Sequence, residues 1–160
     1  MNFEVKPIGI IKTPFKSKDK IPIQANKSAV LGEAEVFPAY AEGLDSLDSF
    51  SHMILLYWFH KAQSPRMKVI PFLDTQERGI FATRAPSRPN PIGLSIVRVL
   101  QIKDNTVRFE GADILNDTPL LDIKPFVPEF DNQLEASSGW LAESKQSKND
   151  DYLGDNRFIK

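Results

Sequence analysis

The sequence predicts a mainly β protein, a small closed or nearly closed β-barrel with short helices and loops. Three observations support this fold class. Short runs of apolar or alternating residues recur along the chain, and little of the chain reads as helix. Hydrophobic residues make up 41% of the 160 residues and include eleven Phe, enough for one globular domain with a proper core. Many short strands with little helix are typical of β-barrels.

The first part of the chain holds two expected strands and one short helix. The strands are expected at residues 3–11 and 29–37, with a polar loop between them. The second has the alternation of a half-buried strand, because polar residues separate its apolar ones, Val30, Ala34 and Val36. Residues 38–48 suit a short helix that ends before Phe50.

Residues 52–60 form the most apolar of the expected strands. Both of its faces are apolar, with Ile54, Leu56 and Trp58 on one and Met53, Leu55, Tyr57 and Phe59 on the other. A strand of this kind is buried on both sides or lies at a subunit interface.

The later strands are followed by a polar tail. We expect them at residues 69–72, 80–83, 94–103, 106–112 and 121–126. Lys103, Asp104 and Asn105 suit a hairpin turn between the third and fourth of these. From about residue 143 onward Ser, Lys, Asn and Asp dominate. We therefore divide the chain into a β-barrel domain at residues 1–142 and a C-terminal tail at residues 143–160.

Composition argues against several classes of protein. No window approaches the apolar length of a membrane span, and no signal sequence follows Met1. Cysteine is absent, which is compatible with a reducing cytoplasm, and two His without Cys argue against a metal site. The eight Gly are too scattered for a dinucleotide fingerprint or a phosphate loop, and no G-x-S-x-G elbow occurs. We expect a cytoplasmic protein with no metal and no membrane partner.

Charge is distributed unevenly along the chain. The net charge of −1 argues against a general nucleic-acid coat. Basic residues nonetheless gather in one early segment, at Lys12, Lys16, Lys18, Lys20 and Lys27, opposed only by Asp19. This segment is either a solvated loop or a patch that contacts phosphates beside an active site.

A stiff loop at residues 81–95 is the most informative stretch of the chain. Its three prolines fix φ at their own positions and push each preceding residue toward extended conformations. Gly93 allows backbone geometry closed to other residues. The loop carries two guanidiniums, Arg84 and Arg88, and because it is already ordered it loses little entropy on binding a ligand.

Three ordered motifs resemble the TsaA-like family. Residues 82–84 with 88–95 are similar to its hallmark, residues 113–126 to its second signature, and residues 50–60 to its central apolar strand. With the Pro-Ile-Gly opening, the resemblance runs from about residue 5 to about residue 131. Family members usually have Asp and Gly where this chain has Asn116 and Asp117, two residues that tolerate turn geometry. The extra C-terminal domain of some bacterial members is not expected here.

The resemblance implies a β-barrel methyltransferase that binds S-adenosylmethionine near the interface of a homodimer. The family's cofactor contacts fall on Ile23, Gln24, Ala25, His60, Lys61, Arg84, Leu94, Asp113, Ile114, Leu115 and Asn116. The cations among these suit the cofactor's carboxylate, and the backbone of residues 113–116 suits its adenine. On the residues alone, Arg84 could instead pair with a carboxylate at a strand end, and His60 could belong to the core.

The implied reaction is methyl transfer to the exocyclic amine of threonylcarbamoyladenosine beside the tRNA anticodon. That nitrogen is a weak nucleophile because its lone pair is delocalised, so alignment and a base would assist. Asp122 and Asp113 are the candidate bases. Candidate substrate contacts are Arg88, Lys124, Lys16, Lys18 and Lys20. Two other functions stay open: a methyltransferase with a different small-molecule or RNA acceptor, and a non-catalytic module that senses S-adenosylmethionine.

Overall fold

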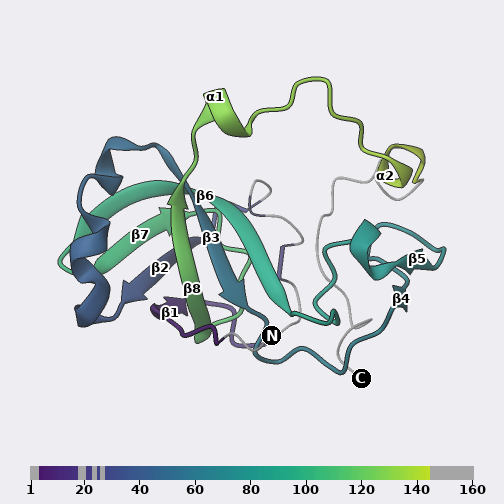
Figure 1. The fold of residues 1–160 in the computed structure, drawn as a ribbon, viewed down its shortest axis with the longest axis horizontal. Helices are drawn as coiled ribbons and strands as arrows, with labels where there is room; N and C mark the ends of the chain where they lie inside the picture. Colours follow the sequence, from purple (N-terminus) through teal and green to yellow (C-terminus); the bar gives the residue numbers. More distant parts are fainter. Residues whose placement is uncertain (1–3, 18–20, 23–24, 26–27, 145–160) are drawn as a thin grey trace.

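Six antiparallel strands close into one barrel (Figure 1). The structure is a computed structural model and describes residues 4–17, 21–22, 25 and 28–144. The strand order around the barrel is β1-β2-β7-β6-β3-β8. The strands are β1 (Gly9–Lys12), β2 (Leu31–Val36), β3 (His52–Trp58), β6 (Ile92–Lys103), β7 (Thr106–Glu110) and β8 (Thr118–Pro125). The predicted fold class, a mainly β closed barrel, is confirmed.

The barrel core follows from the alternation of the strands. On β3, Met53, Leu55 and Tyr57 are buried, and the residues between them are partly exposed. The inward residues of the other strands join the same cluster, among them Ile11, Val97, Val107, Phe109 and Leu120. Because side chains alternate between the faces of a strand, this pattern fixes which residues face outward.

Two expected elements take another form. The helix expected at residues 38–48 is two 3₁₀ segments, η2 (Pro38–Leu44) and η3 (Leu47–Ser49). The strand expected at residues 80–83 is wrong, because residues 80–82 form the 3₁₀ turn η4 (Ile80–Ala82). The Thr83 N–H and Oγ1 both donate to the Ile80 carbonyl, at 3.1 and 2.9 Å, and these local bonds close the turn.

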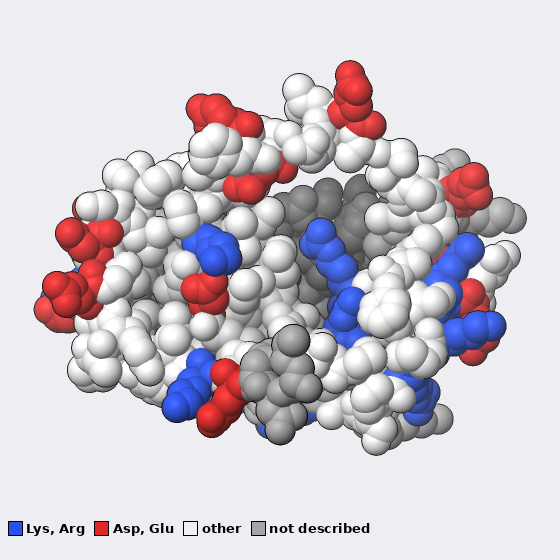
Figure 2. Space-filling view, viewed as in Figure 1, with Lys and Arg blue, Asp and Glu red and all other residues white. Residues whose placement is uncertain are grey.

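A second, smaller unit interrupts the chain between β3 and β6. Here β4 (Lys68–Val69) pairs with β5 (Arg78–Gly79), and Val69, Ile80 and Ala85 form a small core with Phe72. We call residues 66–88 the β4–β5 unit. Figure 2 shows a hollow between this unit and the barrel.

A strap of residues 126–139 runs from the end of β8 toward the β4–β5 unit, as Figure 1 shows. It holds α1 (Pro128–Asp131) and leads into α2 (Trp140–Glu143). Trp140 Nε1 donates to the Ala82 carbonyl at 2.8 Å, and the Arg78 guanidinium lies over the Trp140 ring. The proposed boundary at residue 142 falls inside α2, and residues 145–160 of the proposed tail lie outside the described residues.

None of the helices in the described part of the chain is long and apolar enough to cross a bilayer. Within the same residues, no group of three or more His, Asp or Glu side chains is placed to hold a metal ion.

Candidate functional site

The candidate site lies at one end of the barrel, where β1, β3 and β7 end and β2, β6 and β8 begin. The register of the strands brings together the loop that precedes β6 and the loop between β7 and β8. These are the two segments that carry the first and second sequence motifs. The stiff loop and the second motif, far apart in the sequence, therefore border the same end of the barrel.

A chain of three hydrogen-bonded side chains lies inside this end. The Ser95 hydroxyl donates to Asp113 Oδ1 at 2.6 Å, and the Tyr57 hydroxyl lies 3.0 Å from Ser95 Oγ. Tyr57 pairs with Gly93 across β3 and β6, and a Cβ at Gly93 would lie 2.2 Å from the Tyr57 ring. Gly93 is required at this position because the ring lies against its backbone.

The environment of Asp113 changes its acidity. Burial raises the pKa of the Asp113 carboxyl to about 7, although the Ser95 hydroxyl, the backbone N–H groups of Asp113 and Ala25, and the Arg84 charge act to lower it. Burial also raises the pKa of Tyr57 well above its usual value, so its hydroxyl stays protonated at neutral pH. A carboxyl that titrates near neutral pH is suited to accept a proton.

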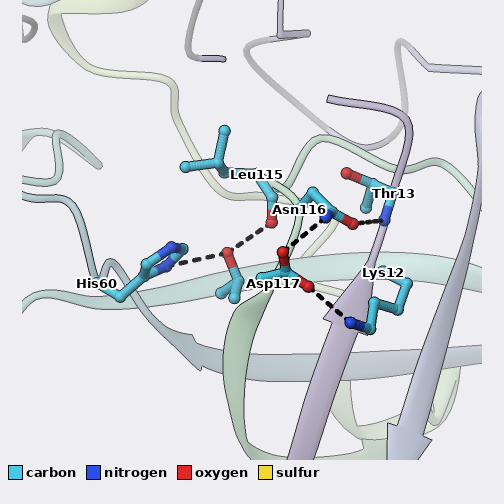
Figure 3. Close-up of polar contacts among 7 residues, drawn as sticks. Lys12, Thr13, His60, Leu115, Asn116 and Asp117 are labelled. Atoms are coloured by element: carbon cyan, nitrogen blue, oxygen red, sulfur yellow. Dashed lines mark hydrogen bonds and ion pairs between the residues drawn. The ribbon is translucent and has the colours of Figure 1, made fainter. Parts of the chain in front are cut away.

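Polar contacts hold the loop of residues 114–118 against the start of the chain (Figure 3). Asn116 Oδ1 accepts from the Thr13 N–H at 3.0 Å, and Asn116 Nδ2 donates to Asp117 Oδ2 at 2.9 Å. Asp117 Oδ1 accepts from Lys12 Nζ at 2.6 Å, and this bond lowers the pKa of Asp117. Thr118 Oγ1 donates to the Leu115 carbonyl at 2.6 Å.

The two arginines of the stiff loop have different surroundings. Arg88 Nη1 donates to the Thr83 carbonyl at 3.0 Å and to the Ala85 carbonyl at 3.4 Å, so it braces its own loop. Arg84 is exposed, and its charge acts on both Asp113 and Tyr57. Arg84 therefore borders the candidate site, whereas Arg88 stabilises the loop that carries it.

Several predicted site residues meet at this end of the barrel. His60 Nδ1 lies 3.4 Å from Thr118 Oγ1, the Ala25 N–H lies beside the Asp113 carboxylate, and Lys61 is exposed next to His60. Ile114 is buried, and its carbonyl accepts from Thr13 Oγ1 at 2.7 Å. Ala25, His60, Arg84 and the residues of the 113–116 segment thus share one neighbourhood.

Other predicted residues lie elsewhere. Leu94 is 42% exposed on the outer face of β6, opposite Leu56. Asp122 pairs with Leu56 in the β-ladder, so it shares this outer face, and Asp122 Oδ2 lies 2.8 Å from Lys124 Nζ. The structure therefore separates the two candidate bases, because Asp113 contacts the inward Ser95 and Asp122 faces outward.

The predicted lysine patch is only partly described. Lys16 is exposed, and Lys12 is bound to Asp117. Lys18, Lys20 and Lys27 lie outside the described residues, as do Ile23 and Gln24 of the predicted cofactor contacts.

Sequence reasoning did not single out Tyr57 or Ser95. The alternation of β3 puts Tyr57 on the same face as Met53 and Leu55, and a buried Tyr hydroxyl needs a hydrogen-bond partner. That requirement is the signal that points to a polar group inside the barrel, although only the strand pairing identifies it as Ser95.

The fold and the site define a class: a small closed β-barrel whose candidate site is built from loops at one end. Residues 10–132 match the family model described as tRNA-methyltransferase O N-terminal domain. The chain belongs to this family, which confirms the resemblance drawn from the sequence motifs.

Named relatives and solved structures are similar over most of the chain. A probable S-adenosyl-L-methionine-binding protein of Pyrococcus abyssi is 48% identical over 155 residues, which cover 96% of this chain and 84% of the relative. A tRNA (adenine(37)-N6)-methyltransferase of Escherichia coli is 33% identical over 151 residues, 87% of this chain and 64% of the relative. The crystal structure of TrmO from Pseudomonas aeruginosa is 38% identical with a TM-score of 0.74, covering 87% of this chain. This chain spans 62% of the crystallised one.

Proposed function

We propose that this protein transfers the methyl group of S-adenosylmethionine to the exocyclic amine of threonylcarbamoyladenosine next to the tRNA anticodon. The family is one of S-adenosylmethionine-dependent methyltransferases, and the Escherichia coli relative is named for methylation of tRNA adenine 37. The observation that carries the proposal is the meeting of Arg84, His60 and the 113–116 segment at one end of the barrel. A tRNA substrate implies the cytoplasm as the compartment.

The residues present fit S-adenosylmethionine as the cofactor. The Arg84 guanidinium is a cation beside the site and suits a carboxylate. The 113–116 segment, held in place by Thr13 and Thr118, offers backbone groups to an adenine edge. When bound, the cofactor supplies an electrophilic methyl group on a sulfonium, and this chain's residues hold the two reactants in line.

Asp113 is the proposed base, and Asp122 is not. The acceptor nitrogen is a weak nucleophile, so removal of its proton assists the transfer. Asp113 lies in the site and titrates near neutral pH. Asp122 lies on the outer face in an ion pair with Lys124, so one protomer does not offer both carboxylates to one acceptor.

We also propose a homodimer formed through the outer face of β3 and β6. Ile92, Leu94 and Ile96 are each about 40% exposed, and their ladder partners Trp58, Leu56 and Ile54 are apolar. Contiguous exposed apolar surface marks an interaction site, and a second copy would cover it. Leu94 and Asp122 would then face the partner subunit, which is consistent with a cofactor site near the interface.

The test is methyl transfer from labelled S-adenosylmethionine to tRNA with and without the threonylcarbamoyl group, followed by nucleoside mass spectrometry. We expect methylation of the threonylcarbamoylated adenosine alone, and loss of the activity in Arg84→Ala. The matched control is Arg108→Ala, which removes an exposed arginine from the outer face of β7. Methylation of unmodified tRNA, or full activity in Arg84→Ala, would contradict the proposal.

One observation favours a second candidate. The Pyrococcus abyssi relative is named only for S-adenosylmethionine binding. Cofactor binding without methylation of any tRNA would therefore favour a sensor module or a methyltransferase with a different acceptor.

A further inference from the structure

Phe81 is a large apolar side chain that is exposed to solvent on an ordered turn. It is 76% exposed, whereas its neighbour Ile80 is 1% exposed. The turn around it is tied down on both sides, because the Ile80 N–H donates to the Met67 carbonyl at 2.9 Å and Trp140 Nε1 donates to the Ala82 carbonyl. Phe81 therefore adds nothing to the core yet sits on a backbone that is already ordered, which favours binding of a ligand.

The surface around Phe81 is basic. Residues 61–91 contain six basic residues, Lys61, Arg66, Lys68, Arg78, Arg84 and Arg88, against two acidic ones, Asp74 and Glu77. The Asp74 charge is held by Arg78 at 2.7 Å. Among the described residues, neither Arg66 nor Lys68 forms an ion pair with a carboxylate. Figure 2 shows Lys and Arg side chains over β4 and β5 and beside the hollow that faces the barrel.

Strand pairing places these basic residues next to Phe81. Lys68 pairs with Gly79, and the Met67–Ile80 bond continues this antiparallel ladder toward Arg66 and Phe81. The backbone of Arg66 is fixed in turn, since its N–H donates to the Ser87 carbonyl at 3.0 Å. Arg84, three residues after Phe81, connects this surface to the Asp113 site through its charge.

An exposed aromatic ring beside cations matches the chemistry of single-stranded RNA. Unpaired bases stack on aromatic side chains, and Lys and Arg neutralise the phosphates between them. An excess of basic residues favours a polyanion such as RNA over a basic or a neutral apolar partner as the occupant of this surface.

We propose that Phe81, Arg66 and Lys68 form the docking surface for the RNA substrate, with the Phe81 ring stacked on an unpaired base beside the target nucleotide. This inference rests on the proposed function, because it takes RNA to be the substrate. It places an RNA contact on the β4–β5 unit, at the start of the stiff loop.

The stacking contact is tested by the affinity of the full chain for an unmodified anticodon stem–loop RNA, measured by fluorescence anisotropy. We expect Phe81→Ala to weaken binding about tenfold, Phe81→Leu to weaken it nearly as much, and Phe81→Trp to retain it. Phe130→Ala is the matched control, because Phe130 is 77% exposed but lies on the strap, and it should leave the affinity unchanged. Exposed positions such as these should not alter the unfolding midpoint.

The charge contact is tested by the salt dependence of the same binding. Replacing Arg66 and Lys68 with Ala removes two phosphate contacts, so the slope of log affinity against log salt should become shallower by roughly 1.4. Lys103→Ala, which removes an exposed lysine at the far end of β6, should leave the slope unchanged.

Unchanged RNA affinity in Phe81→Ala would overturn the proposal. So would a fall in affinity that accompanies a smaller sedimenting species, because Phe81 would then be a subunit contact. Failure of the proposed function is a separate result. RNA binding through Phe81 without methyl transfer would retain the docking surface and reject the reaction. Methyl transfer unaffected by Phe81→Ala would retain the reaction and reject the docking surface.

Discussion

Asp113 and Asp122 show how the surroundings of a residue decide its chemistry. Both are carboxylates from the same sequence motif. Asp113 is enclosed beside Ser95 and Tyr57, and burial raises its pKa to about 7. Asp122 lies on the outer face next to the Lys124 ammonium. The surroundings of Asp113 suit it to exchange a proton near neutral pH.

Ser95→Ala should raise the pKa of Asp113 further. The Ser95 hydroxyl stabilises the ionised carboxylate, and without it the charged form loses a hydrogen bond. Carboxyl ¹³C NMR would measure the shift directly. Because the base must be ionised, the acid limb of the methyl-transfer pH profile should move to higher pH. Tyr57→Phe retains the Ser95–Asp113 bond and should give a smaller shift, and an unchanged pKa in Ser95→Ala would refute the role of Ser95.

Asp113 should also make stability depend on pH. Its pKa is raised from 3.8 to about 7, so the folded state binds the proton more tightly than the unfolded chain. Ionising it therefore costs stability as pH rises from about 4 to about 7, by at most about 4 kcal/mol. Urea unfolding at a series of pH values should show this loss in the wild type, and Asp113→Asn should flatten it. The same slope in both proteins would exclude Asp113 as its source.

At the scale of elements, the loop of residues 114–118 is fixed by contacts that its sequence variant supplies. Asp117 has φ of 61°, the left-handed region that favours Gly, the residue usual in the family at this position. Asp117 compensates by pairing with Lys12, and Asn116 accepts from the Thr13 N–H. Hydrogen bonds from Lys12 and Thr13, at the end of β1, thus stabilise the loop in which Asn116 and Asp117 replace the residues usual in the family.

Asp117→Gly should be nearly neutral, whereas Asn116→Ala should destabilise the protein. The glycine relieves about 1 kcal/mol of backbone strain and loses only an exposed ion pair that solvent screens. Asn116→Ala leaves the Thr13 N–H without its side-chain acceptor and should lower the free energy of unfolding by roughly 0.5–1.5 kcal/mol. Urea denaturation compares the two, and a larger loss in Asp117→Gly would show that the Lys12 pair dominates.

At the scale of the whole molecule, the barrel carries its site at one end and an apolar face on its side. The pattern of residues 52–60 predicts a strand that is apolar on both faces. The second of these faces is the outer face of β3, which is paired with β6. The β4–β5 unit and the strap extend from opposite ends of the barrel and meet at Trp140.

Ile96→Asp should convert the proposed dimer to a monomer. A charge in the centre of an apolar interface would lose its hydration on association, which disfavours the dimer. Sedimentation velocity would measure the mass, and Leu31→Asp is the control, since Leu31 is similarly exposed on β2 away from this face. A wild type that sediments as a monomer, or an Ile96→Asp variant that remains a dimer, would reject this interface.

The sequence by itself determined the barrel class, the apolar strand at 52–60, the turn at 103–105 and the motifs that border the site. These depend on local alternation, turn residues and residue order, which the chain displays directly. It did not determine the turn at 80–82, where the bonds from Thr83 to the Ile80 carbonyl override the strand-like composition.

Only the tertiary structure separated the two candidate bases. Simple alternation would put Asp122 on the same inward face as Leu120. The pairing of β3 with β8 shifts register between Leu56 and Tyr57, so Leu120 pairs with the inward Tyr57 while Asp122 pairs with the outward Leu56. A bulge of this kind reverses the faces of all later residues, and it is set by the pairing between strands far apart in the sequence. That is why Asp122 faces outward, away from Asp113 and the candidate site.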